Sequence, residues 1–200
     1  WTDYNTDLIS KGGGIFDRSA KSIELSPEIQ KRFNLSKTKV TPNELIRALL
    51  MAKADLLWFG GIGTYLKNTG ETHFDVGDRA NDAIRINANQ LNVRVVGEGA
   101  NLGVTQRGRV QAALNGVRIY ADSIDNSAGV DCSDHEVNIK ILIDQIVSQG
   151  SLTKKQRNSL LAQMTEEVGQ QVLVDNYNQT LAINMILYQG MGTFDNQVRL

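Results

Sequence analysis

The sequence predicts an α/β fold: a parallel sheet with crossover helices, followed by an all-helical C-terminal segment. Short apolar segments rich in strand-forming residues recur up to residue 121, and a turn rich in glycine or asparagine follows each of them. Segments with helical spacing separate these strands. This order of strand, turn and helix is typical of parallel sheets, and it predicts a partial Rossmann-like sheet.

The first predicted strand follows a well-marked helix. Thr41, Pro42 and Glu44 have the pattern of a helix start, with a capping threonine, a proline in the first turn and a glutamate that completes a capping box. The helix is expected to end near Lys53, and Ala54 to Phe59 is expected to form a short buried strand. The turn after this strand contains Gly60, Gly61 and Gly63.

The same order recurs further along the chain. We expect a helix at 78–91, a strand at 93–96, a glycine turn at 97–103, a helix from Thr105 to Leu114 and a strand at 117–120. The carboxyl ends of parallel strands lie at one edge of a sheet, where open α/β sheets bind ligands. The turns after residues 59, 97 and 120 are therefore expected to share that edge.

Helical spacing replaces the strand pattern after residue 121. A helix from Asp134 to Gly150 carries apolar residues around much of its surface, which predicts that it is well buried. Thr153 opens a second helix, and a further helical stretch is expected from about Thr165. The predicted domains are the second part of a dinucleotide-binding domain at 1–150 and a helical segment leading to a C-terminal region at 151–200.

The composition argues against several classes of function. The 21 basic and 22 acidic residues give a net charge of −1, which predicts no nucleic-acid partner and no anionic membrane surface. No apolar run approaches the roughly 20 residues that span a bilayer. The single cysteine, Cys132, fits a reducing compartment, and we expect a cytoplasmic location. This cysteine and the two histidines match no standard zinc spacing, so no metal site is expected.

Three turns carry the groups that we expect to face a ligand. Gly60 and Gly61 allow the backbone to approach a ligand closely. Asn101 and Asn126 carry amides that can donate and accept, which matches the carboxamide of a nicotinamide. Local turn capping explains the two asparagines equally well, so from the residues alone both interpretations stay open.

The turn at Gly97, Gly99 and Gly103 also has the spacing of a pyrophosphate-binding turn. Such a first turn places an acidic residue about 20 positions further on, at the end of the second strand. Asp122 is the nearest candidate, and it lies after the third predicted strand. A position late in the sheet is therefore the better hypothesis for this turn.

Several long motifs occur in order between residues 3 and 185. They are Ser10-Lys-Gly-Gly-Gly14, Arg18-Ser-Ala-Lys-Ser-Ile23, Thr41-Pro-Asn-Glu-Leu45, Asp55-Leu-Leu-Trp58, Gly60-Gly-Ile-Gly-Thr-Tyr65, Glu71-Thr-His73, Asp75-Val-Gly-Asp-Arg-Ala-Asn-Asp-Ala-Ile-Arg85, Val96-Gly-Glu-Gly-Ala-Asn-Leu-Gly103 and Asp125-Asn-Ser-Ala-Gly-Val-Asp-Cys-Ser-Asp-His-Glu-Val-Asn138. With these motifs the sequence resembles the large class of bacterial NAD-specific glutamate dehydrogenases.

The resemblance implies oxidation of L-glutamate to 2-oxoglutarate and ammonia, with NAD as the cofactor and a homo-oligomeric full-length enzyme. It implies that the turn with Asn101 lies near the nicotinamide, that Asn126 contacts the nicotinamide ring, and that Ser133, at a predicted helix start, holds the distal carboxylate of the substrate. The catalytic lysine and aspartate are implied to precede Trp1. No catalytic residue is therefore expected in this chain, which we interpret as a segment of a longer protein.

Two other classes of function stay open. The chain could be a self-contained nucleotide-binding regulatory module without redox activity, which would use the Gly97 turn as its phosphate site. It could also be a scaffold segment without a ligand. His73 is interpreted as a hydrogen-bonded loop residue in preference to a general acid. The cluster of Asp75, Asp78, Arg79 and Asp82 could be a site, but it is interpreted as the start of the predicted helix at 78–91, with acids in its first turn.

Overall fold

The computed structural model describes residues 3–198 and divides the chain into two compact units, Trp1–Ala121 and Asp122–Leu200. The boundary expected at 150–151 lies inside the second unit. The assignment of 1–150 to a dinucleotide-binding domain stays a prediction, and what was expected of residues 1–2 and 199–200 lies outside the described residues.

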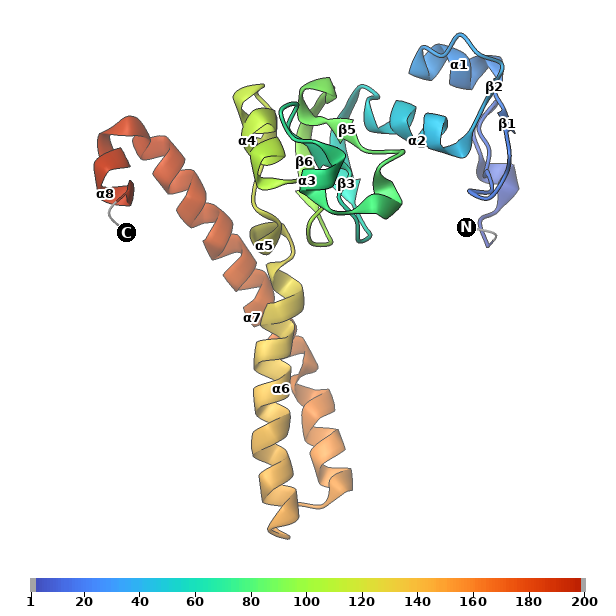
Figure 1. Cartoon of the computed structure of the whole chain (residues 1–200). Helices are drawn as coiled ribbons and strands as arrows, with labels where there is room; N and C mark the ends of the chain where they lie inside the picture. The colour runs from blue at the N-terminus through green and yellow to red at the C-terminus, as the bar shows by residue number, and fades with distance from the viewer. Residues whose placement is uncertain (1–2, 199–200) are drawn as a thin grey trace. The chain divides into compact units, whose positions relative to one another are not determined.

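A three-stranded parallel sheet is the centre of the first unit (Figure 1). Its strands are β3 (Ala54–Phe59), β6 (Val93–Glu98) and β7 (Arg118–Ile119), in the order β3-β6-β7. Trp58 pairs with Gly97, and Phe59 pairs with Glu98. The α/β class is thus confirmed, and the turns that follow the three strands leave the sheet at the same edge, as predicted.

Two capped helices accompany this sheet. Helix α2 (Pro42–Leu50) begins with the predicted capping box of Thr41 and Glu44. Helix α4 (Gln106–Leu114) crosses from β6 to β7, and the Thr105 side chain accepts from the Gly108 N–H at its start. The core between sheet and helices consists of Leu50, Phe59, Leu66, Ile86, Ala88, Val96, Val104, Ala112 and Val117.

The described part of the first forty residues contains several short elements of secondary structure. A short 3-10 helix, η1 (Thr6–Leu8), precedes the antiparallel pair β1 (Ile23–Glu24) and β2 (Lys39–Val40), which are joined through α1 (Pro27–Phe33). A second apolar cluster holds these elements to α2. Its buried residues are Ile23, Leu25, Ile29, Val40 and Leu45.

The prediction of a helix at 78–91 is wrong. The chain there forms two 3-10 turns, η2 (Arg79–Asn81) and η3 (Ala88–Gln90), on either side of the strand β5 (Ile86–Asn87). This strand pairs in parallel with β4 (Leu66–Lys67), and the one-turn helix α3 (His73–Val76) lies between them in sequence. Pairing with β4 satisfies the backbone groups that the predicted helix would have paired internally.

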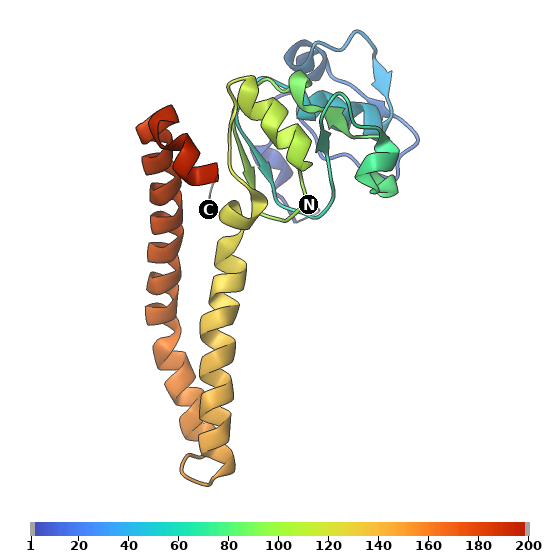
Figure 2. The same ribbon diagram turned by 60° about the vertical axis from the view of Figure 1, so that its left-hand side comes forward.

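The second unit is helical throughout its described part. Helix α5 (Asp122–Asp125) leads into α6 (Ser127–Ser148), which packs along α7 (Lys154–Gln189) as an antiparallel hairpin (Figure 2). The chain continues through η4 (Gly190–Thr193) to α8 (Phe194–Val198). The predicted cap at Thr153 is confirmed as a capping box. Among the described helices, none has the length and apolar character that crossing a membrane requires.

Three expectations for this unit are wrong. Helix α6 starts at Ser127, well before Asp134, and α7 is one continuous helix with no break near Thr165. Of the described α6 residues only Ser127 and Ile143 are buried, so this helix is not the well-buried one that its apolar surface suggested. A hairpin of two helices can cover one side of each helix only, which leaves apolar side chains of both exposed.

Candidate functional site

The loop after β3 has a shape that requires glycine. Gly63 has a φ of +128°, and a Cβ atom there would lie 2.5 Å from the Asn81 amide nitrogen. The Tyr65 hydroxyl donates to the Ile62 carbonyl at 2.9 Å, and the Tyr65 ring stacks on Phe59 at 5.3 Å. The loop is therefore held by its own aromatic residue.

A buried arginine holds the end of this loop. Arg85 is 1% exposed; its Nε donates to the Thr64 carbonyl at 2.8 Å, and a terminal nitrogen donates to the Asp78 carbonyl at 2.5 Å. The other terminal nitrogen binds Asp82 at 2.6 Å and His73 Nδ1 at 2.8 Å. Arginine fixes these segments because its fork of donors can bind several acceptors at once.

The carboxylate of Asp78 also holds the end of the loop after β3. It accepts from the Thr64 N–H at 2.8 Å and from the Asn81 amide at 2.7 Å. The Thr64 N–H first, and then the Asn81 amide, hold the pKa of Asp78 below its ordinary value. Asp78 is therefore an ionised structural acceptor and not a proton donor at neutral pH.

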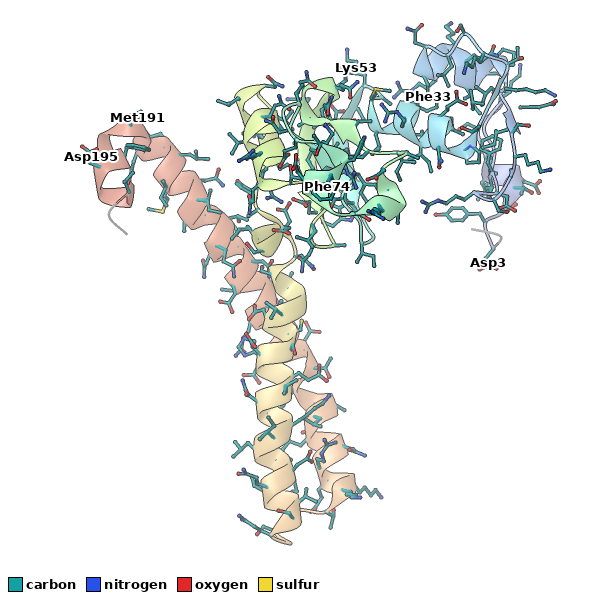
Figure 3. All side chains as sticks on the ribbon, in the orientation of Figure 1. Asp3, Phe33, Lys53, Phe74, Met191 and Asp195 are labelled. Atoms are coloured by element: carbon teal, nitrogen blue, oxygen red, sulfur yellow. The ribbon has the colours of Figure 1, made fainter. Side chains whose placement is uncertain are left out.

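His73 contributes to this group through its position on α3. Arginine only donates hydrogen bonds, so Nδ1 of His73 is the acceptor and its neutral form carries the proton on Nε2. The next residue, Phe74, is 85% exposed. Figure 3 labels it on α3. The interpretation of His73 as a hydrogen-bonded residue is confirmed, although it lies in a short helix and not in a loop.

The turn after β6 is shaped by a buried glutamate. Glu98 is 0% exposed; it accepts from the Val104 N–H at 3.1 Å and forms an ion pair with Arg109 at 2.5 Å. Leu102 has a φ of +66° within this turn. The Gly103 carbonyl accepts from the Tyr65 N–H at 2.9 Å, so the turns after β3 and β6 are joined through the backbone.

Packing explains the glycines of the G-x-G pattern. A Cβ atom on Gly97 would lie 2.6 Å from the Trp58 ring, and one on Gly99 would lie 2.5 Å from it. Both distances are shorter than carbon atoms in contact can adopt. These glycines therefore accommodate an indole from the neighbouring strand, which supports the hypothesis that they do not bind a pyrophosphate.

A cavity of about 760 Å³ opens beside the two joined turns. Its lining includes Asn101 and Leu102 from the turn after β6, and Asp78 and Asn81 from the segment that Arg85 holds. Arg18 also lines it. The volume lies within the range of small-molecule sites in proteins, about 300–1,000 Å³.

The other predicted site residues lie elsewhere. Gly60 and Gly61 line a smaller cavity of about 220 Å³, which shares only Tyr65 with the larger one. Asn126 is the N-cap residue of α6, in the second unit. Ser133 is exposed in the interior of α6, so the expectation that it lies at a helix start, with the N–H groups of a first turn beside it, is wrong.

Sequence reasoning gave no role to Gly63, Thr64 or Arg85. The Gly60 to Tyr65 motif pointed to the loop, but nothing in the sequence distinguishes a buried arginine from a surface one. Asp78 was noticed and assigned to a helix start, whereas it binds a loop fourteen residues earlier in the chain. Only the tertiary contact reveals its role.

The arrangement is suited to binding. Asp78, which lines the cavity, already accepts hydrogen bonds from Thr64 and Asn81, so its carboxylate holds the loop in place. The fold and the cavity define an α/β protein with a candidate ligand site at the carboxyl edge of a parallel sheet.

The family model described as "Bacterial NAD-glutamate dehydrogenase, catalytic domain" matches residues 1–186. The chain therefore belongs to that family. Three curated relatives are named NAD-specific glutamate dehydrogenase. That of Halomonas elongata is 61% identical over 197 residues, which are 97% of this chain. Those of Pseudomonas aeruginosa and Mycobacterium tuberculosis are 56% and 53% identical, over 92% and 90% of this chain.

The matches cover a small part of each relative. They span 12% of the Halomonas elongata protein and 11% of each of the other two. The chain thus spans only about one ninth to one eighth of the length of these three relatives.

Proposed function

We propose that this chain forms the nicotinamide side of the cofactor site in an NAD-dependent glutamate dehydrogenase that oxidises L-glutamate to 2-oxoglutarate and ammonia. The family match over residues 1–186 supports the activity. The observation that carries the placement is the cavity beside Asn101, at the edge of the parallel sheet where such folds bind nucleotides.

Asn101 is the predicted cofactor-binding residue that lines the larger cavity. In this proposal the Asn101 amide binds the carboxamide. The role of Asn126 as a contact of the nicotinamide ring is proposed on the family resemblance alone. The exposed backbone of Gly60 and Gly61 permits close approach of the cofactor. NAD, when bound, supplies the acceptor for the hydride of the substrate.

In this proposal the residues of the chain bind and orient the substrate and the cofactor. Ser133 holds the distal carboxylate of glutamate through its hydroxyl, without help from a helix start. The carboxylates that line or support the cavity are engaged in structural hydrogen bonds. We therefore assign no general base to this chain, although amino-acid oxidation requires one.

The rival module without redox activity has less support. It needs the Gly97 turn as its primary phosphate site, and Trp58 lies against both Gly97 and Gly99. We also propose a cytoplasmic location, supported by the single cysteine, and a homo-oligomeric full-length protein, supported by the apolar side chains exposed on α6 and α7.

Steady-state kinetics of the full-length protein test the proposal. We expect Asn101→Ala to raise the KM for NAD about three- to tenfold, the loss of one hydrogen bond, and to leave the KM for glutamate unchanged. Ser133→Ala is expected to raise the KM for glutamate and to leave the KM for NAD unchanged. Asn158→Ala, an amide on α7 outside the site, is the matched control and should change neither constant.

A melting temperature equal to that of the parent protein shows that each variant is folded. If folded Asn101→Ala protein kept the parent KM for NAD, Asn101 would not touch the cofactor and the placement would be overturned.

A further inference from the structure

Three potential metal ligands meet between α6 and α7. Asp131 and His135 lie four residues apart on α6, and therefore on the same face of that helix. Asp175 of α7 faces them. Each residue offers one ligand atom, and these atoms all lie within 4.8 Å of one another. The group combines one imidazole nitrogen with two carboxylate oxygens, and it belongs to the second unit alone.

The separations are longer than direct hydrogen bonds. His135 Nε2 lies 3.4 Å from Asp131 Oδ1 and 3.8 Å from Asp175 Oδ2, whereas charged N–H···O pairs close to about 2.7–2.9 Å. The same two helices show a closed ion pair elsewhere, because Arg157 Nε lies 2.5 Å from Asp144 Oδ1. The longer spacing around His135 is therefore not forced by the packing of these two helices.

A shared cation explains such spacing. Ligand atoms about 2.0–2.2 Å from a tetrahedral metal lie roughly 3.4 Å from one another. The two distances from His135 Nε2 are close to that edge length, and rotation of the exposed Asp175 carboxylate can shorten the longer contacts.

Asp131 supplies an independent observation. Its side chain is 18% exposed, and its Oδ2 atom is buried without a hydrogen-bond partner among the described residues. A buried carboxylate oxygen without a partner is costly, and unpaired polar atoms of this kind call for a specific explanation. A cation that the Asp131 carboxylate binds through both Oδ1 and Oδ2 satisfies this oxygen without any further protein donor.

The backbone around the group is fixed by neighbouring contacts. The buried Ser127 hydroxyl donates to the Asn176 side chain at 2.9 Å, which joins α6 to α7 beside Asp175. The Asn176 amide in turn donates to the Val172 carbonyl at 2.8 Å. The two helices therefore present the three ligands from a set register.

We propose that Asp131, His135 and Asp175 bind a divalent transition-metal cation that fastens α6 to α7. An imidazole with two carboxylates suits Zn²⁺ or Mn²⁺ better than Mg²⁺, which prefers oxygen ligands alone. Three protein ligands leave a fourth position for water. The site is independent of the cofactor role proposed above.

Calorimetric titration of the 200-residue chain with Zn²⁺ tests the site, with Co²⁺ as a spectroscopic probe of coordination. We expect one Zn²⁺ per chain and the visible absorption of four-coordinate Co²⁺. His135→Gln and Asp175→Asn should each weaken Zn²⁺ binding more than tenfold, because the loss of even an outer-shell partner costs a metal site about 10–100-fold. Zn²⁺ should also raise the melting temperature of the parent chain.

Matched controls separate this site from adventitious binding. His73→Gln removes the only other histidine, Asp144→Asn neutralises a carboxylate between the same helices, and Cys132→Ser removes the neighbouring thiol. Each should bind Zn²⁺ within about twofold of the parent chain. Circular dichroism establishes that each variant is folded. If His135→Gln protein does not fold, Asp131→Asn takes its place and should weaken Zn²⁺ binding in the same way.

Either of two results overturns the proposal. One is the absence of Zn²⁺ binding by the parent chain. The other is Zn²⁺ binding that survives in folded His135→Gln and Asp175→Asn protein but is lost in Cys132→Ser or His73→Gln.

Discussion

Trp58 shows at the level of single residues how a sequence pattern can have two causes. Glycines spaced as G-x-G after a strand are typical of phosphate-binding turns, where they allow a backbone to approach an anion. Here Gly97 and Gly99 lie against the indole of Trp58, which pairs with Gly97 across the sheet. The glycines are required for packing, and the ligand cavity begins only at Asn101, further along the turn.

This packing leads to a prediction for Gly99→Ala. The added methyl group would lie 2.5 Å from the indole, so the ring must move away from the turn. We expect a loss of about 1 kcal/mol in the free energy of unfolding, measured by urea denaturation. This is the low end of the cost of overpacking, because Trp58 is 57% exposed and its ring can move toward solvent.

The control is Gly61→Ala, where nothing lies within 4 Å of the added Cβ. That change should alter the free energy of unfolding by no more than about 0.5 kcal/mol. In a Trp58→Ala background Gly99→Ala should lose most of its cost, since its clash partner is gone. An equal cost in both backgrounds would show that Trp58 is not the reason for glycine at this position.

Local signals decided which elements the sequence could predict. Helices α2 and α4 were predicted because Thr41 and Thr105 are capping residues whose hydrogen bonds lie within a few residues. The helix at 78–91 was wrong because Arg85 binds Thr64, twenty-one residues earlier in the chain. A periodic pattern carries no information about such a contact, and tertiary pairing prevailed over helical propensity.

The capping box of α2 makes this helix sensitive to acid. The Lys37 ammonium, which donates to Glu44 at 2.6 Å, and next the Thr41 backbone N–H lower the pKa of Glu44 from 4.5 to about 2. Because the folded-state pKa is the lower one, the stabilisation by Glu44 is present above pH 4.5 and is lost as the pH falls through about 2.

Glu44→Gln should therefore destabilise the chain at neutral pH, and its difference from the parent chain should shrink between pH 4.5 and about 2. Denaturant unfolding at several pH values measures this difference. In a Lys37→Gln background the pH-dependent part should be smaller but present, because the Thr41 hydrogen bonds remain. A difference that stays constant down to pH 2 would contradict the assignment.

At the scale of the whole molecule, the sequence predicted the fold class better than the site. Local patterns predicted the strands and the edge that they share. The change from strand spacing to helical spacing after residue 121 predicted the helical second unit. Of the predicted site residues, Asn101 lines the larger cavity, whereas Gly60 and Gly61 line another one. The roles of Asn126 and Ser133, in the second unit, stay predictions.

The clusters that no pattern predicted share a physical cause. Arg85 with its acceptors, and Asp131 with His135 and Asp175, are both assembled from segments far apart in sequence. The expectation of no metal site rested on zinc spacings that consist of cysteine and histidine alone. Carboxylate ligands from a second helix lie outside any such pattern.

The central claim is that this chain supplies the nicotinamide side of the cofactor site. The most direct test is calorimetric titration of the 200-residue chain with nicotinamide mononucleotide and, separately, with AMP. The account predicts weak saturable binding of nicotinamide mononucleotide that Asn101→Ala reduces and Asn158→Ala does not, with AMP binding more weakly still. Tighter binding of AMP, or no binding of nicotinamide mononucleotide, would contradict it.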